Sequence, residues 1–195
     1  MCGRFHFSRD VADEMIISIL TTMERKYPGQ FKTGELFPGD TVPGIIAWNE
    51  KIVPIPATFE FPGFQEKKLL INARSETVAE KMTFAGSFRE RRIVLPATSF
   101  YEWSHDAKKQ KYQFSVKDTS ALYLCGIYKI IDGEVRFVIL TREANESMVE
   151  IHHRMPVILL EHEVRGYLTD YPTALEFIGS TPPVLERRIV SMLEK

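Results

Sequence analysis

The dipeptide Asp132-Gly133 constrains the fold more than any other feature of the sequence. It separates two runs of mainly apolar and aromatic residues, 122–131 and 135–141. An Asp-Gly pair between two such runs favours a two-residue turn in which both residues have positive φ, and this turn connects antiparallel strands. The sequence therefore predicts a β-hairpin in the second half of the chain.

Shorter segments also have the composition or the alternation of β-strands. They lie at residues 45–48, 52–55, 69–73, 93–96, 100–103, 112–116 and 156–160. Pro43, Pro54 and Pro56 indicate that the first two are edge or bulged strands, because proline has no N–H to donate within a sheet. Asn49-Glu50 between those two strands is the expected turn.

Fewer segments have the pattern of helices. Apolar residues recur at helical spacing over residues 9–26, with Ser8 as the expected N-cap. We expect shorter helices at 76–81 and 161–168 and a helical turn at 148–151, while the tail from residue 185 fits helix or strand equally. Many strands with few helices predict an α+β fold, a single domain over residues 1–195 with a curled mixed or antiparallel sheet and flanking helices.

Composition limits the possible functions. The 25 basic and 26 acidic residues balance, so any nucleic-acid site must be a local patch. Apolar runs are too short to span a membrane, and the N-terminus lacks the pattern of a signal peptide. Cys2 and Cys125 are too few for a disulfide framework. We therefore expect a cytoplasmic protein without a membrane partner, and a monomer.

Cys2 follows the initiator Met1 directly. Removal of Met1 would leave an α-amine, with a pKa near ~7.7–8.0, and a thiol, near ~8.5, on one residue. The ammonium would lower the pKa of the thiol. Such an aminothiol condenses with an aldehyde to a thiazolidine ring. Position alone also fits the plain alternative, in which Cys2 merely follows the start.

Asn72 and Arg74 form a second candidate site. Both side chains lie on one face of the strand predicted at 69–73, at the point where a helix begins. An amide beside a guanidinium suits an oxyanion or a phosphate. The alternative is an asparagine that caps a strand end and an arginine in solvent.

Glu102 and His152 supply candidate proton carriers. Glu102 shares a strand face with Phe100, and burial among aromatic residues would favour its protonated form. His152 and His153 precede Met155-Pro156, and a histidine exchanges protons near neutral pH. The alternatives are an edge-strand glutamate in water and two ordinary loop histidines. A zinc site from Cys2, Cys125, His152 and His153 lacks a short paired ligand motif, so we expect neither metal nor cofactor.

Taken together, four segments resemble the SOS-response-associated peptidase (SRAP) family, in its order and at about its spacing. They are Met1–Phe5, Ile71–Thr77, Phe100–Trp103 and Ile151–Pro156. The resemblance implies a single α+β domain around a barrel-like sheet. It also implies an enzyme that captures abasic sites in single-stranded DNA covalently, with autopeptidase and lyase-like activity in the response to DNA damage. In a bacterium such a protein would be associated with the nucleoid.

The resemblance also assigns roles to residues. Cys2 would form the thiazolidine crosslink, Asn72 would position the reacting groups, Glu102 would act as acid and base, and His152 would promote opening of the sugar ring. Arg4, Arg74 and Trp103 would contact the DNA. The peptidase step would remove Met1 alone. The chain departs from the family pattern at 35–38, at 59–62, where it adds Glu60, and at His153, where the family often has aspartate.

Two other functions stay open at this level. One alternative makes Cys2 the nucleophile of a thiol hydrolase, with its own amine or His152 as base. The other is a non-catalytic single-strand binding module that uses Trp103 and the Arg89–Arg92 cluster. That module would also need Phe59 and Phe61, which belong with Phe64 to a loop predicted at 57–68 that is either exposed or folded over the core.

Overall fold

A computed structural model describes residues 2–62, 69–105 and 109–191. Its larger sheet contains a closed ring of strands in the order β12, β4, β3, β8 and β11, since β12 pairs with both β4 and β11. These strands are β3 (Thr41–Trp48), β4 (Lys51–Phe59), β8 (Arg92–Ala97), β11 (Leu122–Ile131) and β12 (Glu134–Glu143). β7 (Asn72–Arg74), β13 (Arg154–Pro156) and β14 (Ile158–Leu159) join the ring at its rim. The α+β fold with a curled mixed sheet is confirmed.

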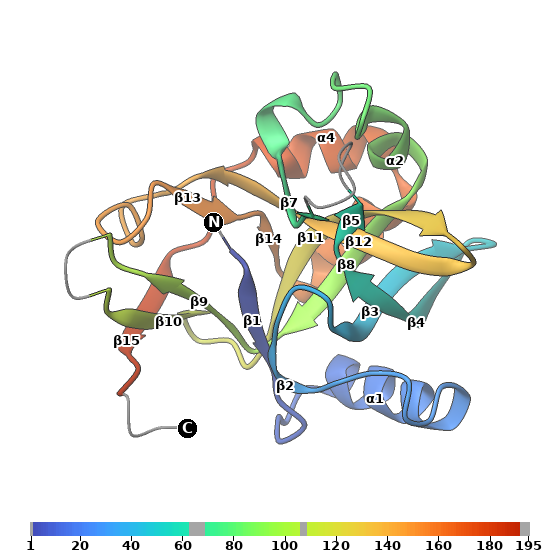
Figure 1. Ribbon diagram of the computed structural model, residues 1–195, viewed down its shortest axis with the longest axis horizontal. Coiled ribbons are helices and arrows are strands. Elements are labelled where there is room, and N and C mark those ends of the chain that lie inside the picture. Colours follow the sequence, from blue (N-terminus) through green and yellow to red (C-terminus); the bar gives the residue numbers. More distant parts are fainter. Residues whose placement is uncertain (1, 63–68, 106–108, 192–195) are drawn as a thin grey trace.

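A second, antiparallel sheet lies beside the ring (Figure 1). Its strand order is β15, β10, β9, β1, β2. The strands are β1 (Arg4–Phe7), β2 (Gly34–Leu36), β9 (Ser99–Trp103), β10 (Lys111–Val116) and β15 (Leu185–Ile189). The first part of the tail is thus a strand, over Leu185–Ile189. A short pair, β5 (Phe61–Pro62) and β6 (Leu69–Leu70), completes the strands of the described residues.

Both predicted turns connect hairpins. Asp132 and Gly133 have φ values of 53° and 81°, and Asn49 and Glu50 have 47° and 61°. Positive φ at both positions of a two-residue loop matches the twist of the flanking strands. Each loop is closed by a register pair, Ile131 with Glu134 and Trp48 with Lys51.

The sequence predicted edge or bulged strands at Pro43, Pro54 and Pro56. The edge position is wrong, because β3 and β4 lie inside the ring, and the two strands pair residue for residue without a bulge between them. In each strand, the prolines lie outside the part that pairs with the neighbour on its other side, which is β8 for β3 and β12 for β4. β3 pairs with β8 at Ile45 and Ile46, and β4 pairs with β12 at Thr58 and Phe59. The missing N–H of each proline therefore costs no hydrogen bond to β8 or β12, and both strands can lie within the sheet.

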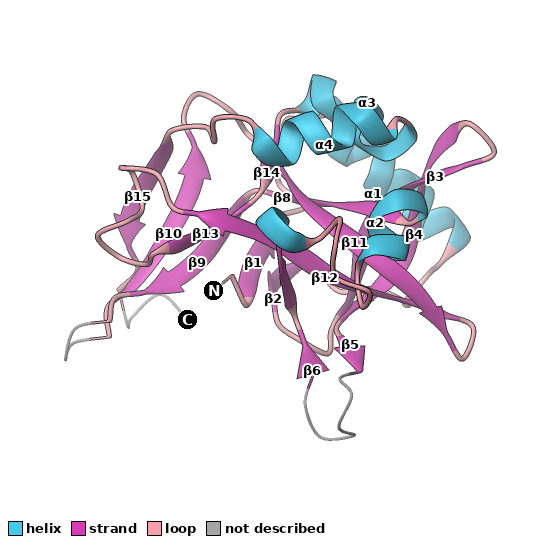
Figure 2. Ribbon diagram, turned by 90° about the horizontal axis from the view of Figure 1, so that it is seen from above, coloured by secondary structure: helices cyan, strands magenta, loops and turns pink. Residues whose placement is uncertain are grey.

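Three of the four helices in the described residues pack against the larger sheet, and the last one packs on the helix before it (Figure 2). They are α1 (Glu14–Lys26), α2 (Ala85–Glu90), α3 (Val164–Thr169) and α4 (Tyr171–Gly179), with 3-10 turns η1 (Ser75–Thr77) and η2 (Glu161–Glu163). The first helix begins at residue 14 rather than 9, because the side chain of Asp13, not Ser8, accepts a hydrogen bond from Ile16 N–H. The predicted helix at 76–81 is only the turn η1, and α2 and α4 were not predicted.

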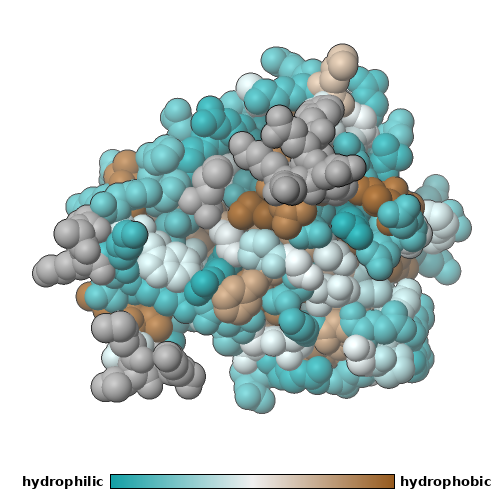
Figure 3. All heavy atoms as spheres, in the orientation of Figure 1, coloured by the Kyte–Doolittle hydropathy of each residue, from teal (hydrophilic) through white to brown (hydrophobic). Residues whose placement is uncertain are grey.

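The loop predicted at 57–68, either exposed or folded over the core, is strand in its first part, and there the exposed alternative is wrong. Phe59 and Phe61 are fully buried in β4 and β5, and Phe59 stacks on Phe137 with ring centroids 5.0 Å apart. Phe64 lies outside the described residues. On the face shown in Figure 3, apolar residues form small groups among polar ones rather than one continuous surface. No described helix is long and apolar enough to cross a membrane.

Candidate functional site

Cys2 lies directly before β1, where Figures 1 and 2 show the start of this strand between β9 and β13. The residue is 1% exposed, and its thiol donates a long hydrogen bond to the carbonyl oxygen of Arg4 at 3.8 Å. Burial raises the pKa of the Cys2 thiol well above its usual range, and the charge of Glu102 raises it further. Desolvation disfavours the thiolate, and here it outweighs the lowering effect of the N-terminal ammonium on the thiol pKa.

Asn72 holds the backbone of Cys2 in place. Its Nδ2 donates to the carbonyl oxygen of Cys2 at 3.1 Å and to that of Ile139 on β12 at 3.5 Å. Its Oδ1 is buried and has no hydrogen-bond partner among the residues that the structure describes. A buried acceptor without a partner is costly, so this oxygen is suited to accept a hydrogen bond from a group that is added at the N-terminus.

Glu102 lies on β9 in the middle of the smaller sheet, between β1 and β10. The residue is 7% exposed, and its face is shared with the fully buried Phe100, as predicted. The alternative of an edge-strand glutamate in water is therefore wrong. The negative charge of Glu102 raises the pKa values of both the Cys2 thiol and the His152 imidazole, so the carboxylate lies within electrostatic reach of both groups.

His152 is 5% exposed and is therefore not an ordinary loop histidine. Burial lowers the pKa of its imidazole, and the nearby Glu102 opposes this effect. Its Nδ1 lies 2.9 Å from the backbone nitrogen of Arg154, which donates to it, and 3.1 Å from the carbonyl oxygen of Arg154. The ring is neutral near pH 7 and is fixed in orientation by the backbone two residues further on.

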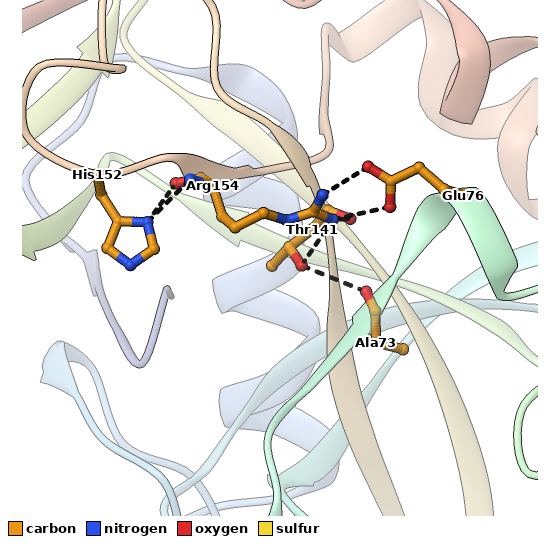
Figure 4. Close-up of polar contacts among 5 residues, drawn as sticks. All are labelled: Ala73, Glu76, Thr141, His152 and Arg154. Carbon is orange, nitrogen blue, oxygen red and sulfur yellow. Dashed lines mark hydrogen bonds and ion pairs between the residues drawn. The ribbon is translucent and has the colours of Figure 1, made fainter.

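An ion pair between the buried Arg154 and the exposed Glu76 connects the segments 71–77 and 151–156, and sequence reasoning missed it (Figure 4). Nη1 and Nη2 of Arg154 donate to the two carboxylate oxygens of Glu76 at 2.6 and 2.9 Å, and Nη2 also donates to the carbonyl oxygen of Thr141. The Arg154 guanidinium lowers the pKa of Glu76. The sequence did contain a signal for this pair, since Glu76 and Arg154 have opposite charges and lie in two of the four segments that resemble the SRAP family. The pair fixes the backbone that orients His152.

Arg4 lies in an aromatic and acidic surrounding. Its guanidinium is 4.4 Å from the ring centroid of Phe37 and 4.8 Å from that of Trp103. Its Nη1 also donates to Oε1 of Glu35 at 3.3 Å, and Nζ of Lys111 donates to the same oxygen at 2.7 Å. Arg4 and Trp103 are therefore brought together. The departure at 35–38 supplies the carboxylate and the second ring.

The remaining predicted residues divide into two groups. Arg74 is exposed at the end of β7, next to the site and available to solvent. Glu60, in contrast, is paired with Arg136 at 3.4 Å and is mostly buried, so it is no free charge on the surface.

The residues that the single-strand binding module required are not on the surface together. Phe59 and Phe61 are buried, and Arg92 is 7% exposed. The guanidinium of Arg92 donates to the carbonyl oxygens of Phe88, Tyr167 and Leu168, where helices α2 and α3 end. Arg92 thus caps the C-termini of two helices, and its guanidinium is not available to bind the phosphates of a nucleic acid.

The zinc ligand set considered from sequence is also not assembled. Cys125 is buried in β11, where burial raises the pKa of its thiol well above the usual range. Within the described part of the chain, neither cysteine joins a group of three or more potential metal ligands. The group that does form contains His105, His152 and His153.

Comparison with known proteins identifies the family. The family model described as SOS response associated peptidase (SRAP) matches residues 1–186. Among similar proteins, the abasic site processing protein YoaM of Bacillus subtilis is 33% identical over 144 residues, which are 70% of this chain and 61% of YoaM. YobE of B. subtilis is 29% identical over 91% of this chain and 75% of its own, and YedK of Escherichia coli is 27% identical over 86% and 79%. Both also carry the name abasic site processing protein.

Solved structures show the same fold. A protein from Bacteroides thetaiotaomicron aligns over 100% of this chain and 95% of its own with a TM-score of 0.74 at 20% identity. A phage-related protein from Bordetella bronchiseptica aligns over 97% and 94% with the same score at 21% identity. Because the family model covers nearly the whole sequence, the chain belongs to the SOS response associated peptidase (SRAP) family.

Proposed function

We propose that this protein processes abasic sites in single-stranded DNA by forming a covalent thiazolidine link through Cys2 after removal of Met1. The observation that carries the proposal is that side chains from two distant segments act on Cys2, and that one of them also acts on His152. Asn72 binds the Cys2 carbonyl oxygen, and the charge of Glu102 acts on both the Cys2 thiol and His152. The names of YoaM, YobE and YedK support the choice of an abasic site as the target.

The first step is attack of the Cys2 amine on the aldehyde of the opened deoxyribose. The amine becomes nucleophilic near neutral pH, since its ordinary pKa is about 7.7–8.0. The product is a carbinolamine, and its hydroxyl leaves as water when an acid supplies a proton. Glu102, whose charge acts on the Cys2 thiol, is the candidate for this acid, and the unpartnered Oδ1 of Asn72 would accept a hydrogen bond from the amine and orient it.

The second step closes the ring. The Cys2 sulfur adds to the imine carbon, and the thiol proton ends on the former amine nitrogen, so the whole reaction releases one water. Because burial raises the pKa of this thiol, the sulfur would need a base to take its proton during the addition. His152 is suited to that role, since its lowered pKa keeps the ring neutral. The same ring would assist the opening of the sugar.

The departure of Met1 must precede both steps, because an amide-bound nitrogen is not nucleophilic. In this proposal the peptidase activity in the family name acts on the bond between Met1 and Cys2. Arg4, Trp103 and Arg74 would contact the flanking DNA: Arg4 and Arg74 through phosphate, and Trp103 through stacking on a base. A missing base makes the damaged nucleotide easy to extrude, because no stacking has to be broken.

The test uses protein in which mass spectrometry has verified the loss of Met1. This protein is incubated with a single-stranded oligonucleotide that contains one abasic site. We expect an adduct that survives denaturation and whose mass is the sum of both partners less one water. Cys2→Ala should abolish it, whereas the matched variant Cys125→Ala should retain it. A chain with additional N-terminal residues, which keeps the Cys2 nitrogen in an amide, should also fail.

The controls separate the competing functions. A thiol hydrolase would turn over amides without DNA and lose this activity in Cys2→Ser. A non-covalent binding module would bind undamaged and abasic strands alike and keep its affinity in Cys2→Ala. Absence of any adduct with correctly processed protein would refute the proposal.

A further inference from the structure

Three histidine rings lie together at one end of the site. His105 follows β9, and His152 and His153 precede β13. The ring centroids of His152 and His153 are 4.5 Å apart, and those of His105 and His152 are 4.9 Å apart. One potential ligand atom from each ring lies within 4.8 Å of the other two. These three side chains come from two loops that are distant in sequence, so the fold brings them together.

The spacing suits a transition-metal ion. Imidazole nitrogens bind Zn²⁺ at about 2.0–2.1 Å, so two nitrogens of one tetrahedral ion lie roughly 3.3 Å apart. His105 and His153 are exposed, and small rotations of their side chains would close the remaining gap to the buried His152. The negative charge of Glu102 acts on the His152 ring and also favours a cation there. The N-terminal ammonium opposes a cation at this ring, and the Arg154 guanidinium is paired with Glu76.

The backbone around His152 supports either of two tautomers. When the Arg154 N–H donates to Nδ1 at 2.9 Å, the proton of the neutral ring sits on Nε2. When the proton sits on Nδ1, it can be donated to the carbonyl oxygen of Arg154 at 3.1 Å, and Nε2 presents a lone pair. A histidine that binds a metal typically donates its other N–H to a carbonyl or carboxylate in this way. The second tautomer finds its acceptor in place, but it removes the acceptor of the Arg154 N–H.

We propose that His105, His152 and His153 form a binding site for a divalent transition-metal ion of the zinc, nickel or copper class. Three imidazoles would hold the ion, and a fourth position would remain for water. Binding to the neutral rings shifts the His152 proton from Nε2 to Nδ1 and releases none. The bound ion would occupy the lone pair that the proposed chemistry needs, so metal and crosslinking would compete for His152.

The test measures binding directly, by isothermal titration of the protein with Zn²⁺. The chain should carry Cys2→Ser, so that the Cys2 thiol cannot act as a ligand; the other cysteine, Cys125, is buried in β11. We expect one ion per chain, with affinity lowered roughly tenfold or more in both His105→Ala and His153→Ala. The matched control is His162→Ala, which removes an exposed histidine outside the cluster and should bind as the parent does. Because both replaced ligands are exposed, their loss should leave folding intact, which thermal unfolding would verify.

Failure of the parent to bind Zn²⁺ stoichiometrically would overturn the site, as would equal affinity in His105→Ala and His162→Ala. The competition with crosslinking rests on the proposed function, whereas the binding does not. In the chain with Cys2 intact, saturating Zn²⁺ should slow the adduct, and His105→Ala should remove this inhibition. Equal rates in the parent with and without bound Zn²⁺ would overturn the competition. Absence of adduct without metal would refute the proposed function while the titration still decides the site.

Discussion

The charge balance around Arg4 yields a quantitative prediction. Oε1 of Glu35 accepts from both Arg4 at 3.3 Å and Lys111 at 2.7 Å, so one carboxylate is shared by two cations on the expected DNA surface. Glu35→Gln removes this charge and keeps the size of the side chain. All three side chains are partly exposed, and pairs of this kind contribute only about 0–1 kcal/mol to stability, so the variant should fold.

The expected gain follows from counterion release. If the freed charge neutralises one more phosphate, the slope of log affinity against log salt for a single strand should steepen by about 0.7. At roughly 0.1 M salt, this change in slope makes the variant bind the strand about fivefold more tightly than the parent does. Between about 50 and about 200 mM salt, the ratio of variant to parent affinity should fall by roughly 2.6-fold, since the added slope acts over about 0.6 log units.

The assay is fluorescence anisotropy with an undamaged single-stranded oligonucleotide at several salt concentrations, with Cys2→Ala in both proteins to prevent crosslinking. The matched control is Glu150→Gln, which makes the same change in net charge at an exposed pair with Arg187. Equal slopes in the parent and Glu35→Gln, or an equal change in Glu150→Gln, would refute the idea that Glu35 restrains DNA binding at Arg4.

Three further predictions concern the positions of charged groups. Arg92→Met should lower the free energy of unfolding by about 3 kcal/mol or more, measured by urea denaturation, because it leaves buried carbonyl groups at the ends of α2 and α3 without a donor; the exposed Arg89→Met should change it little. Arg154→Lys should lower the free energy of unfolding by about 1–3 kcal/mol and slow adduct formation, since lysine cannot make both bonds to Glu76. An unchanged rate of adduct formation would show that the pair does not position His152. Because the pKa of His152 is lowered in the folded protein, the unfolded chain binds a proton at this residue at a higher pH than the folded chain does. The free energy of unfolding should therefore decrease as the pH falls below about 6.5, the ordinary pKa of histidine. His152→Gln should flatten this part of the curve of stability against pH. Identical profiles for the parent and His152→Gln would contradict the burial argument.

Local patterns in the sequence were sufficient for much of the fold. The Asp132-Gly133 and Asn49-Glu50 turns were read correctly, because the backbone conformation of a two-residue hairpin depends mainly on the residues in it. The alternation around Glu102 also predicted the correct face of β9. Predictions of exposure failed where neighbours decide it. Phe59 and Phe61 look like loop residues in sequence, yet β12 and the surrounding core bury them.

For the site, the sequence by itself determined which groups are present: an aminothiol precursor at Cys2, an amide at Asn72, a carboxylate at Glu102 and an imidazole at His152. Only the tertiary structure decided what surrounds them. The high thiol pKa, the pair of Arg154 with Glu76 and the contact of His105 with His152 arise between segments far apart in the chain. Burial and charge act through space, so their effect on a group depends on the fold and not on its neighbours in sequence.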